Sequence, residues 1–314
     1  MTALQRSAEL TNTAALAGRA PRTADPDWSA LASRIRGVVV RPRDPAYEQG
    51  RLLVNQRYDD VRPQALVYPA CVEDVVAIVR FARDRDVRLA LRSGGHSYAG
   101  YSTGPGFVLD VGSLHTTSVG GGRALFGAGV KGMQAHLALA AAGAGLPLGR
   151  CPTIGLAGVT LGGGLSAFTR AWGLACDHLR SVELVTADGQ VRRVGPRSEP
   201  PDDDLFWALC GGGGGNFGVV TSLEFATEVT RDQHFARFTL TWPAADTAAV
   251  IRGWTHWNAD PGTPRALWSA FEQLSDAGAP SLPAVTGTFI GTPTPCSPRW
   301  TAWSPPSTAA RSNA

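Results

Sequence analysis

The chain has 314 residues, of which 44% are hydrophobic and 18% charged, so it can bury a large core and is long enough for two domains; disorder along the whole chain is excluded. Its net charge of +3 comes almost entirely from arginines spread along the sequence, with Lys131 as the single lysine, and this dispersion argues against a nucleic-acid groove. The 37 glycines gather in short runs, which indicates backbone brought close to a ligand.

Residues 1–34 are predicted to form an N-terminal arm, polar and alanine-rich at first, with a short helix running into a strand between Trp28 and Val40. The arm contains no apolar run of signal-peptide length, and no run in the chain approaches the roughly 20 residues of a membrane helix. The five cysteines show no C-x-x-C spacing, which argues against a disulfide framework and a zinc site. We therefore expect a cytoplasmic protein without a membrane partner.

Alternating patterns begin at residue 65. They predict a strand at 65–70, a helix at 73–86, and strands at 87–92, 106–114 and 123–130. The helix has apolar residues at helical spacing, namely Val75, Val76, Val79 and Phe81 or Ala82. A glycine turn follows the strand at 87–92, which is the first place where the pattern suggests a binding loop.

The next segments mix helices and hairpins. A helix at 133–145 is stopped by Gly143 and Gly145, and residues 151–168 are expected to be a loop punctuated by glycines. Residues 181–194 predict a β-hairpin that turns at Asp188-Gly189, and residues 202–227 predict a short helix, a glycine loop and a strand. Because no regular βαβ repeat appears, the fold class is predicted to be α+β.

A second region is expected to begin at residue 231. Residues 234–242 alternate like a strand and residues 247–260 have the pattern of a helix, so 231–290 is assigned to part of a substrate domain. Residues 291–314 are rich in Pro, Ser, Thr and Ala without a period and are assigned to a low-complexity tail. The remaining stretch, residues 35–230, is assigned to one domain.

The segment Arg92-Ser93-Gly94-Gly95-His96-Ser97-Tyr98 lies where a predicted strand ends. Two adjacent glycines allow the backbone to present successive N–H groups to a phosphate, and Arg92 adds charge to this nest, so a pyrophosphate would fit there. Taken alone, a Gly-Gly turn is more often a structural device.

A second segment, Cys151-Pro152-Thr153-Ile154-Gly155-Leu156-Ala157-Gly158, is followed by three glycines at 162–164. Each glycine costs a helix about 1 kcal/mol, which indicates that a flat or anionic ligand lies against this stretch. A lone buried cysteine is usually a small apolar residue, and this is the interpretation of Cys176.

Other patterns suggest chemistry but are better explained by structure. The loop GGGGGNFG at 211–218 lacks the Lys-Ser/Thr of a nucleotide-phosphate loop, so a nucleoside triphosphatase is not favoured. Asp202, Asp203 and Asp204 precede an apolar helical pattern and are interpreted as first-turn carboxylates rather than metal ligands. The tryptophans of residues 242–268 are interpreted as core, with a substrate cleft as the alternative.

Together these segments resemble the berberine-bridge-enzyme-like FAD-linked oxidases of the vanillyl-alcohol-oxidase superfamily. The resemblance covers residues 35–230 and is carried by RSGGHSYAG, DVGSL, GRCPTIGLAGVTLGGG, RAWGLACDHL, VTADG and DLFWALCGGGGGNFGVVTSLEF. It implies a two-subdomain FAD-binding fold of the PCMH type, followed by the start of an incomplete antiparallel-sheet substrate domain. Because members of the family are longer, it also implies a chain truncated at the C-terminus.

The resemblance implies that FAD is held covalently, with His96 joined to the flavin 8α-methyl and Cys151 to flavin C6. The imidazole must attack as the neutral base and the thiol as the thiolate, and Arg150 is expected to lower the thiol pKa by its charge. The resemblance assigns cofactor binding to Arg92, Ser93, Gly94, Gly95, His96, Ser97, Tyr98, Cys151, Thr153, Gly155, Gly158, Gly162, Gly163, Asp177, Gly218 and Val220.

The implied activity is that of an oxidase, in which hydride passes from an alcohol or amine carbon to flavin N5 and O2 reoxidises the flavin to give H2O2. A small-molecule substrate and O2 are the expected partners. The alternatives are a truncated, inactive flavin-binding remnant and a non-flavin interaction domain in which all glycine segments are structural. No catalytic base is identified, and Tyr98 is a distant candidate.

Overall fold

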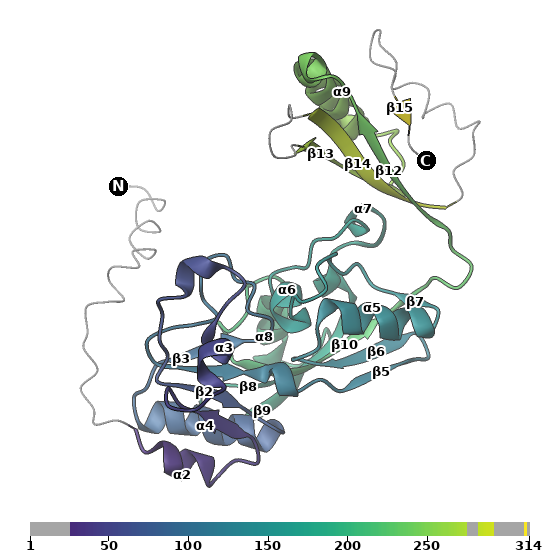
Figure 1. Cartoon of the computed structure of the whole chain (residues 1–314). Coiled ribbons are helices and arrows are strands. Elements are labelled where there is room, and N and C mark those ends of the chain that lie inside the picture. The colour runs from purple at the N-terminus through teal and green to yellow at the C-terminus, as the bar shows by residue number, and fades with distance from the viewer. Residues whose placement is uncertain (1–25, 275–281, 292–310, 313–314) are drawn as a thin grey trace, which may run out of the picture.

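A computed structural model of the chain describes residues 26–274, 282–291 and 311–312, and Figure 1 shows their arrangement. The first sheet has four strands in the order β1-β2-β4-β3. Its strands are β1 (Val38–Val40), β2 (Ala65–Tyr68), β3 (Leu89–Arg92) and β4 (Phe107–Asp110). Strand β4 pairs in parallel with both β2 and β3, while β1 is antiparallel to β2. The carboxyl ends of three strands therefore lie at one edge of this sheet, the edge at which open sheets of this kind bind ligands.

Helix α4 (Val72–Asp84) connects β2 to β3 and confirms the predicted helix and strands. Its buried face includes Val75 and Val79 from the predicted stripe, together with Ile78. Two shorter elements precede β2, namely α3 (Tyr47–Arg51) and the 3-10 helix η2 (Gln56–Tyr58). These two short elements support the loop that follows β3.

The boundary predicted at residue 34 is wrong for helix α2 (Trp28–Ala32), because this helix packs into the domain. Trp28 is 3% exposed, and its ring lies 5.5 Å from the rings of both Phe81 and Phe107. The carboxylate of Asp27 caps the helix by accepting a hydrogen bond from the amide of Ala30 (3.0 Å). Burial of a large aromatic ring outweighs the polar character of the flanking sequence. Residues 1–25 of the predicted arm lie outside the described residues.

The second sheet is antiparallel, with five strands in the order β5-β6-β10-β8-β9. These strands are β5 (Thr117–Gly120), β6 (Arg123–Gly127), β8 (Leu179–Val185), β9 (Val191–Val194) and β10 (Val219–Ala226). The predicted hairpin is confirmed, since β8 and β9 pair antiparallel across a turn in which Gly189 has φ +78°. A two-stranded ladder joins β7 (Ala144–Gly145) to β11 (Glu228–Val229).

Helices and short 3-10 turns connect the strands of this sheet. They are η3 (Val111–Ser113), α5 (Gly132–Ala141), α6 (Leu156–Leu161), α7 (Thr169–Trp172), η4 (Ala175–His178) and α8 (Asp202–Leu209). Figure 1 shows α5 and α6 on one side of the sheet. The first turn of α8 contains the three aspartates, as predicted. Across the described residues, no group of three His, Cys, Asp or Glu side chains is arranged to hold a metal ion.

The interpretation of residues 151–168 as loop is wrong for α6, a helix of six residues. Its buried residues, Leu156, Ala157, Thr160 and Leu161, recur at helical spacing and form one apolar face, which offsets the cost of Gly158. The first two sheets share one hydrophobic core, in which Phe107 and Leu109 of β4 belong to the same cluster as Phe126 and Phe225.

The third sheet lies at one end of the molecule in Figure 1, with helix α9 (Thr247–Ala259) beside it. Its strand order is β13-β14-β12-β15, and all its pairs are antiparallel. The elements are β12 (Phe235–Thr241), η5 (Ala244–Asp246), β13 (Leu267–Leu274), β14 (Leu282–Ile290) and β15 (Arg311–Ser312). Trp242 is buried with Val250 and Val285, in line with its interpretation as core.

The third sheet contacts the part of the chain that holds the first two sheets through α7 and the residue before it. The ring of Phe235 packs against Phe168 and Trp172, and Arg265 donates to the carbonyl of Arg170 (3.2 Å). Within the predicted tail, Arg311–Ser312 pairs with β12, whereas residues 292–310 and 313–314 lie outside the described residues. No described helix has the length and apolar character needed to span a membrane.

Candidate functional site

Three glycine segments that are far apart in the sequence meet at the carboxyl edge of the first sheet. The loop after β3 lies against the loop before α6: a methyl carbon added at Gly94 would lie 2.1 Å from the backbone nitrogen of Gly155. One added at Gly155 would lie 2.1 Å from the hydroxyl oxygen of Ser93. The third segment joins them where the amide of Gly213 donates to the carbonyl of Leu161 (2.8 Å). Only glycine permits the first of these contacts.

The loop after β3 has the properties of an anion-binding nest. Gly95 adopts the left-handed conformation with φ +70°, which turns successive amides toward one side. Among the residues that the structure describes, no oxygen accepts a hydrogen bond from the amides of residues 94–98. Unpaired amides in a partly buried loop are costly unless a ligand or solvent accepts their hydrogen bonds.

Helix α6 presents a bare backbone surface beside this nest. Gly158 in the helix and Gly162 at its C-terminal cap are both exposed and lie about one turn apart. A methyl carbon added at Gly158 would meet no atom within 4 Å, while one added at Gly214 would lie 3.6 Å from the Cα of Gly158. A flat ligand can therefore approach this helix closely.

His96 and Cys151 come together through a residue between them. The Nε2 atom of His96 lies 2.8 Å from the hydroxyl oxygen of Thr153, and the sulfur of Cys151 lies 3.7 Å from the same oxygen. His96 belongs to the nest and the carbonyl of Thr153 packs against Gly94, so the two predicted attachment residues share one small cluster next to the nest.

The local environment favours the reactive form of both residues. Burial, and then the charge of Lys131, lowers the pKa of His96, which favours the neutral imidazole. Hydrogen bonds from the amide and the hydroxyl of Thr153, and from the amide of Ile154, lower the pKa of Cys151. The expectation that Arg150 lowers this pKa is wrong, because hydrogen bonds to the sulfur, rather than that charge, produce the shift.

Lys131 is a site residue that the sequence analysis missed. Its ammonium group donates to the carbonyl of Ser93, so it lies directly behind the nest. Burial lowers its pKa, while the nearby carboxylate of Asp110 opposes that shift. Its being the single lysine of the chain, immediately before a helix, is the only feature of the sequence that sets it apart.

Contrary to prediction, the side chain of Arg92 does not add its charge directly to the nest. Its buried guanidinium donates to the carbonyls of Gly50, Arg51 and Ser102, and lies 3.9 Å from the carboxylate of Asp110. Strand register explains this direction, since Arg92 stands opposite Asp110 in the parallel ladder. Arg92 therefore anchors the end of α3 beneath the loop.

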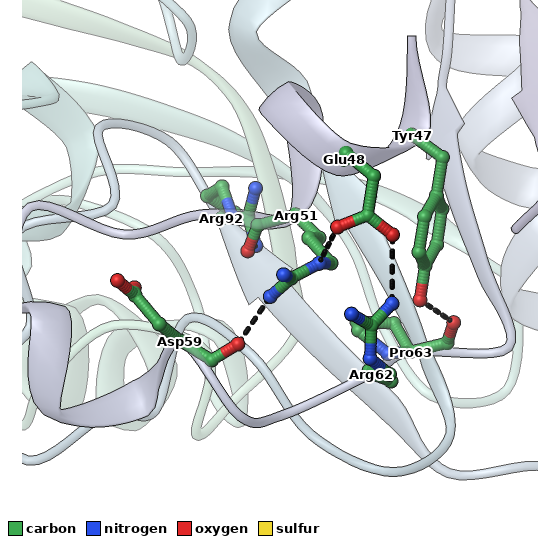
Figure 2. Close-up of polar contacts among 7 residues, drawn as sticks. All are labelled: Tyr47, Glu48, Arg51, Asp59, Arg62, Pro63 and Arg92. Atoms are coloured by element: carbon green, nitrogen blue, oxygen red, sulfur yellow. Dashed lines mark hydrogen bonds and ion pairs between the residues drawn. The ribbon is translucent and has the colours of Figure 1, made fainter. Parts of the chain in front are cut away.

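Figure 2 shows the polar contacts of α3 that support this anchor. Glu48 accepts hydrogen bonds from Arg51 (2.8 Å) and Arg62 (2.7 Å), and these bonds, the one from Arg62 above all, lower its pKa. The hydroxyl of Tyr47 donates to the carbonyl of Pro63 (2.6 Å). These contacts fix the segment that contains Asn55 and Tyr58.

Asn55 and Tyr58 support the loop after β3 at Tyr98. The carbonyl of Tyr98 accepts hydrogen bonds from the side-chain amide of Asn55 (3.2 Å) and the hydroxyl of Tyr58 (3.2 Å). The side chain of Tyr98 itself is 93% exposed, so nothing in this part of the chain orients it as a base. Ser97 accepts a hydrogen bond from the amide of Tyr101 (3.2 Å), which closes the turn.

The remaining predicted residues have backbone and packing roles. Gly163 and Gly218 adopt positive φ angles (+106° and +147°), and a methyl carbon at Gly218 would lie 2.6 Å from the carbonyl oxygen of Val185. Val220 is buried in β10. Asp177 accepts a hydrogen bond from the amide of Leu174 (2.8 Å) and so holds the turn before η4.

The chain is similar to known FAD-linked proteins. Residues 63–195 match the family model of the FAD binding domain. The FAD-linked oxidoreductase YgaK of Bacillus subtilis is 33% identical over 250 residues, which cover 76% of this chain and 53% of that protein. The FAD-linked oxidoreductase ZEB1 of Gibberella zeae is 40% identical over 161 residues, covering 48% of this chain and 28% of that protein.

Solved structures show the same fold. BBE-like 1 of Physcomitrella patens superposes with a TM-score of 0.81 at 28% identity, covering 93% of this chain and 62% of that one. Phl p 4.0202, a glucose dehydrogenase, superposes with a TM-score of 0.76 at 26% identity, covering 88% of this chain and 57% of that one. The chain thus spans about half to three fifths of the length of three of these four proteins.

The fold and the site define an FAD-binding protein of the mixed helix and antiparallel-sheet type. Residues 63–195 belong to the FAD binding domain family, and the fold of the chain is that of the berberine-bridge-enzyme-like proteins. The residues present fit the cofactor: the unpaired amides of the nest suit a pyrophosphate, and the open backbone face at Gly158 and Gly162 suits a flat ring system.

Proposed function

We propose that this chain forms the flavin-holding part of an FAD-dependent oxidase, in which the cofactor is attached covalently to His96 and Cys151. The observation that carries the proposal is the cluster of His96, Thr153 and Cys151 beside the nest and the open glycine face. When bound, FAD supplies the redox chemistry, accepting a hydride at N5 from an alcohol or amine carbon and passing two electrons to O2 to give H2O2.

The residues of the nest hold the pyrophosphate in this proposal. The amides of residues 94–98 supply the hydrogen bonds, and the ammonium group of Lys131, behind the carbonyl of Ser93, adds positive charge. The carbonyl anchors of Arg92 hold α3 and the loop in place. These groups bind and orient the cofactor and take no part in proton transfer.

Each attachment is an oxidative substitution. An imidazole nitrogen of His96 would take the place of a hydrogen of the ring methyl, and the two protons and two electrons released would pass to O2 to give H2O2. The sulfur of Cys151 would likewise take the place of a ring hydrogen, with two protons and two electrons passing to a second O2. Both steps need the free lone pair of the protein atom, which the lowered pKa values of His96 and Cys151 favour.

Acid precipitation of the purified full chain tests the attachment. We expect the wild-type pellet to keep its yellow colour, the His96→Ala and Cys151→Ala variants each to keep part of it, and the double variant to lose it. His115→Ala and Cys71→Ala are matched controls, because His115 is exposed and burial raises the pKa of the Cys71 thiol. Release of all flavin from the wild-type pellet would contradict covalent attachment.

Turnover decides whether the chain is also catalytically active. H2O2 formation from sugar, alcohol and amine donors, measured with the wild type and the double variant, separates an oxidase from a flavin-binding remnant. A yellow protein that forms no H2O2 and whose flavin no donor reduces under anaerobic conditions would support the remnant.

A further inference from the structure

The hydroxyl of Thr153 lies between two atoms that the proposed function treats as nucleophiles. Its oxygen is 2.8 Å from Nε2 of His96 and 3.7 Å from the sulfur of Cys151. Cys151 is two residues away along the chain, but His96 is 57 residues away and comes from the loop after β3. Thr153 is therefore the only direct polar link between the two attachment residues that the described structure contains.

The backbone on either side of Thr153 is held firmly, so the position of its hydroxyl is set by the fold. The amide of Gly132 donates to the carbonyl of Ile154 (2.9 Å), and the amide of Met133 donates to the carbonyl of Pro152 (3.0 Å). Both donors belong to the first turn of α5. The carbonyl oxygen of Thr153 also packs against Gly94, where an added methyl carbon would lie 2.9 Å from it.

A threonine hydroxyl has one proton to donate and lone pairs to accept with, so its two partners constrain each other. The sulfur of Cys151 lies within hydrogen-bond distance of this hydroxyl, and a thiolate has no proton to give, so when Cys151 is ionised the hydroxyl must donate its proton to the sulfur. The oxygen then faces Nε2 of His96 with a lone pair and accepts the hydrogen bond. In a neutral imidazole with a proton on Nε2, the other nitrogen, Nδ1, carries the free lone pair.

We propose that Thr153 is the positioning residue for both attachments: its hydroxyl accepts from Nε2 of His96 and donates to the sulfur of Cys151, leaving Nδ1 and the sulfur as the two nucleophilic atoms. The inference rests on the proposed function, because it concerns how the two attachment residues are prepared. Thr153 itself forms no bond to the cofactor. Its role is to fix the tautomer of one group and to stabilise the ionised form of the other.

The charged groups around the cluster do not supply the same effect. Burial is the largest cause of the lowered pKa of His96, and the charge of Lys131 is the second. Lys131 is not among the causes of the lowered pKa of Cys151. The amides of Thr153 and Ile154 act on the sulfur but leave the imidazole unconstrained. Only the hydroxyl couples the two residues, so its removal has a consequence at both.

The test uses three variants of the full chain. Thr153→Val and Thr153→Ala remove the hydroxyl, whereas Thr153→Ser keeps it. Thr117→Val is the matched control, because Thr117 is exposed on β5 and its hydroxyl donates only to the carbonyl of His115 (3.3 Å). The side chain of Thr153 is exposed, so either replacement is accommodated; circular dichroism checks that each variant folds.

The first readout is the pH profile of iodoacetamide alkylation at Cys151, measured by peptide mass spectrometry on chain purified from riboflavin-limited cells. We expect the profile of Thr153→Val and Thr153→Ala to move to higher pH, with a rate at neutral pH at least about threefold lower than that of the wild type. Thr153→Ser and Thr117→Val should match the wild type. The amide of Thr153 remains in every variant, so a purely structural role would not produce this shift.

The second readout is the covalent share of the bound flavin after acid precipitation. We expect it to fall in both hydroxyl-free variants at His96 and at Cys151, and to be restored in Thr153→Ser. In flavin-free chain, nitrogen-15 NMR of His96 should show the Nε2-protonated tautomer in the wild type and a mixture in Thr153→Val.

Coincident alkylation profiles for Thr153→Val and the wild type, or a Thr153→Ser variant as impaired as Thr153→Val, would overturn the proposal. These results are distinguishable from failure of the proposed function. If the wild type releases all its flavin in acid, covalent attachment is refuted, while the alkylation profile and the tautomer of His96 still decide the role of Thr153.

Discussion

The contact between Gly94 and Gly155 allows a sharp test of how the site is assembled. Replacing Gly94 with alanine adds one methyl carbon, which would lie 2.1 Å from the nitrogen of Gly155 and 2.9 Å from both the Cα of Gly155 and the carbonyl oxygen of Thr153. All three are atoms that a rotamer change cannot move. The two loops must therefore separate by about 1 Å or more.

Overpacking of this kind costs about 1–3 kcal/mol, and the upper part of that range applies because backbone must move. For a domain of this size, about 2–3 kcal/mol corresponds to a fall in Tm of roughly 4–12 °C. The same separation would pull Thr153 away from His96, so the covalent share of the flavin should fall as well.

Thermal unfolding followed by circular dichroism gives the stability, and acid precipitation gives the covalent flavin. Gly104→Ala is the matched control, since its added methyl carbon would lie 3.9 Å from the Cβ of Ala90, an ordinary contact. If Gly94→Ala melted within about 1 °C of Gly104→Ala, a shift too small for a backbone clash, the close approach of the two loops would be refuted.

Three further predictions concern the groups around the cluster. Lys131→Met removes a charge that lowers the pKa of His96, so this pKa should rise, although the larger effect of burial remains. Histidine NMR measures the change, and as the pH is lowered covalent attachment should begin to slow at a higher pH than in the wild type, because the imidazole becomes protonated earlier. Arg92→Met leaves buried carbonyls without donors and should lower the free energy of unfolding by about 3 kcal/mol in urea, whereas Arg62→Met, at an exposed side chain, should change it little. Gly158→Ala should not lower the Tm, because alanine favours a helix by about 1 kcal/mol, yet it should weaken FAD binding in equilibrium dialysis; unchanged binding would show that the cofactor does not lie against this face.

Several elements followed from the sequence because their causes are local. The apolar spacing of Val75 and Val79 predicts one face of α4, and the Asp188-Gly189 turn predicts the β8-β9 hairpin. Where local composition misled, burial was the reason: Trp28 fills the core from a polar segment, and α6 forms around Leu156 despite its glycines. The residues against which Trp28 and Leu156 pack cannot be identified from the sequence around them.

The candidate site also has residues that the sequence predicted and residues that it did not. His96 and Cys151 were identified through motif resemblance, together with the glycine segments, because a backbone that must approach a ligand closely requires glycine wherever it occurs. Lys131 was missed, and Arg92 and Arg150 were given roles that the structure does not support. The residue type gives the charge of a side chain. The direction in which the side chain points depends on strand register and on carbonyl groups elsewhere in the sequence.

The sequence by itself therefore determined the strands and helices with clear periodicity, the glycine-rich character of the binding loops and the residue types at their centre. Only the tertiary structure decided that Thr153 lies between His96 and Cys151, and that Lys131 lies behind Ser93. His96 and Thr153 are 57 residues apart in the sequence, and Lys131 and Ser93 are 38 residues apart. Contacts across such separations arise from the packing of two sheets on one core, which no local pattern specifies.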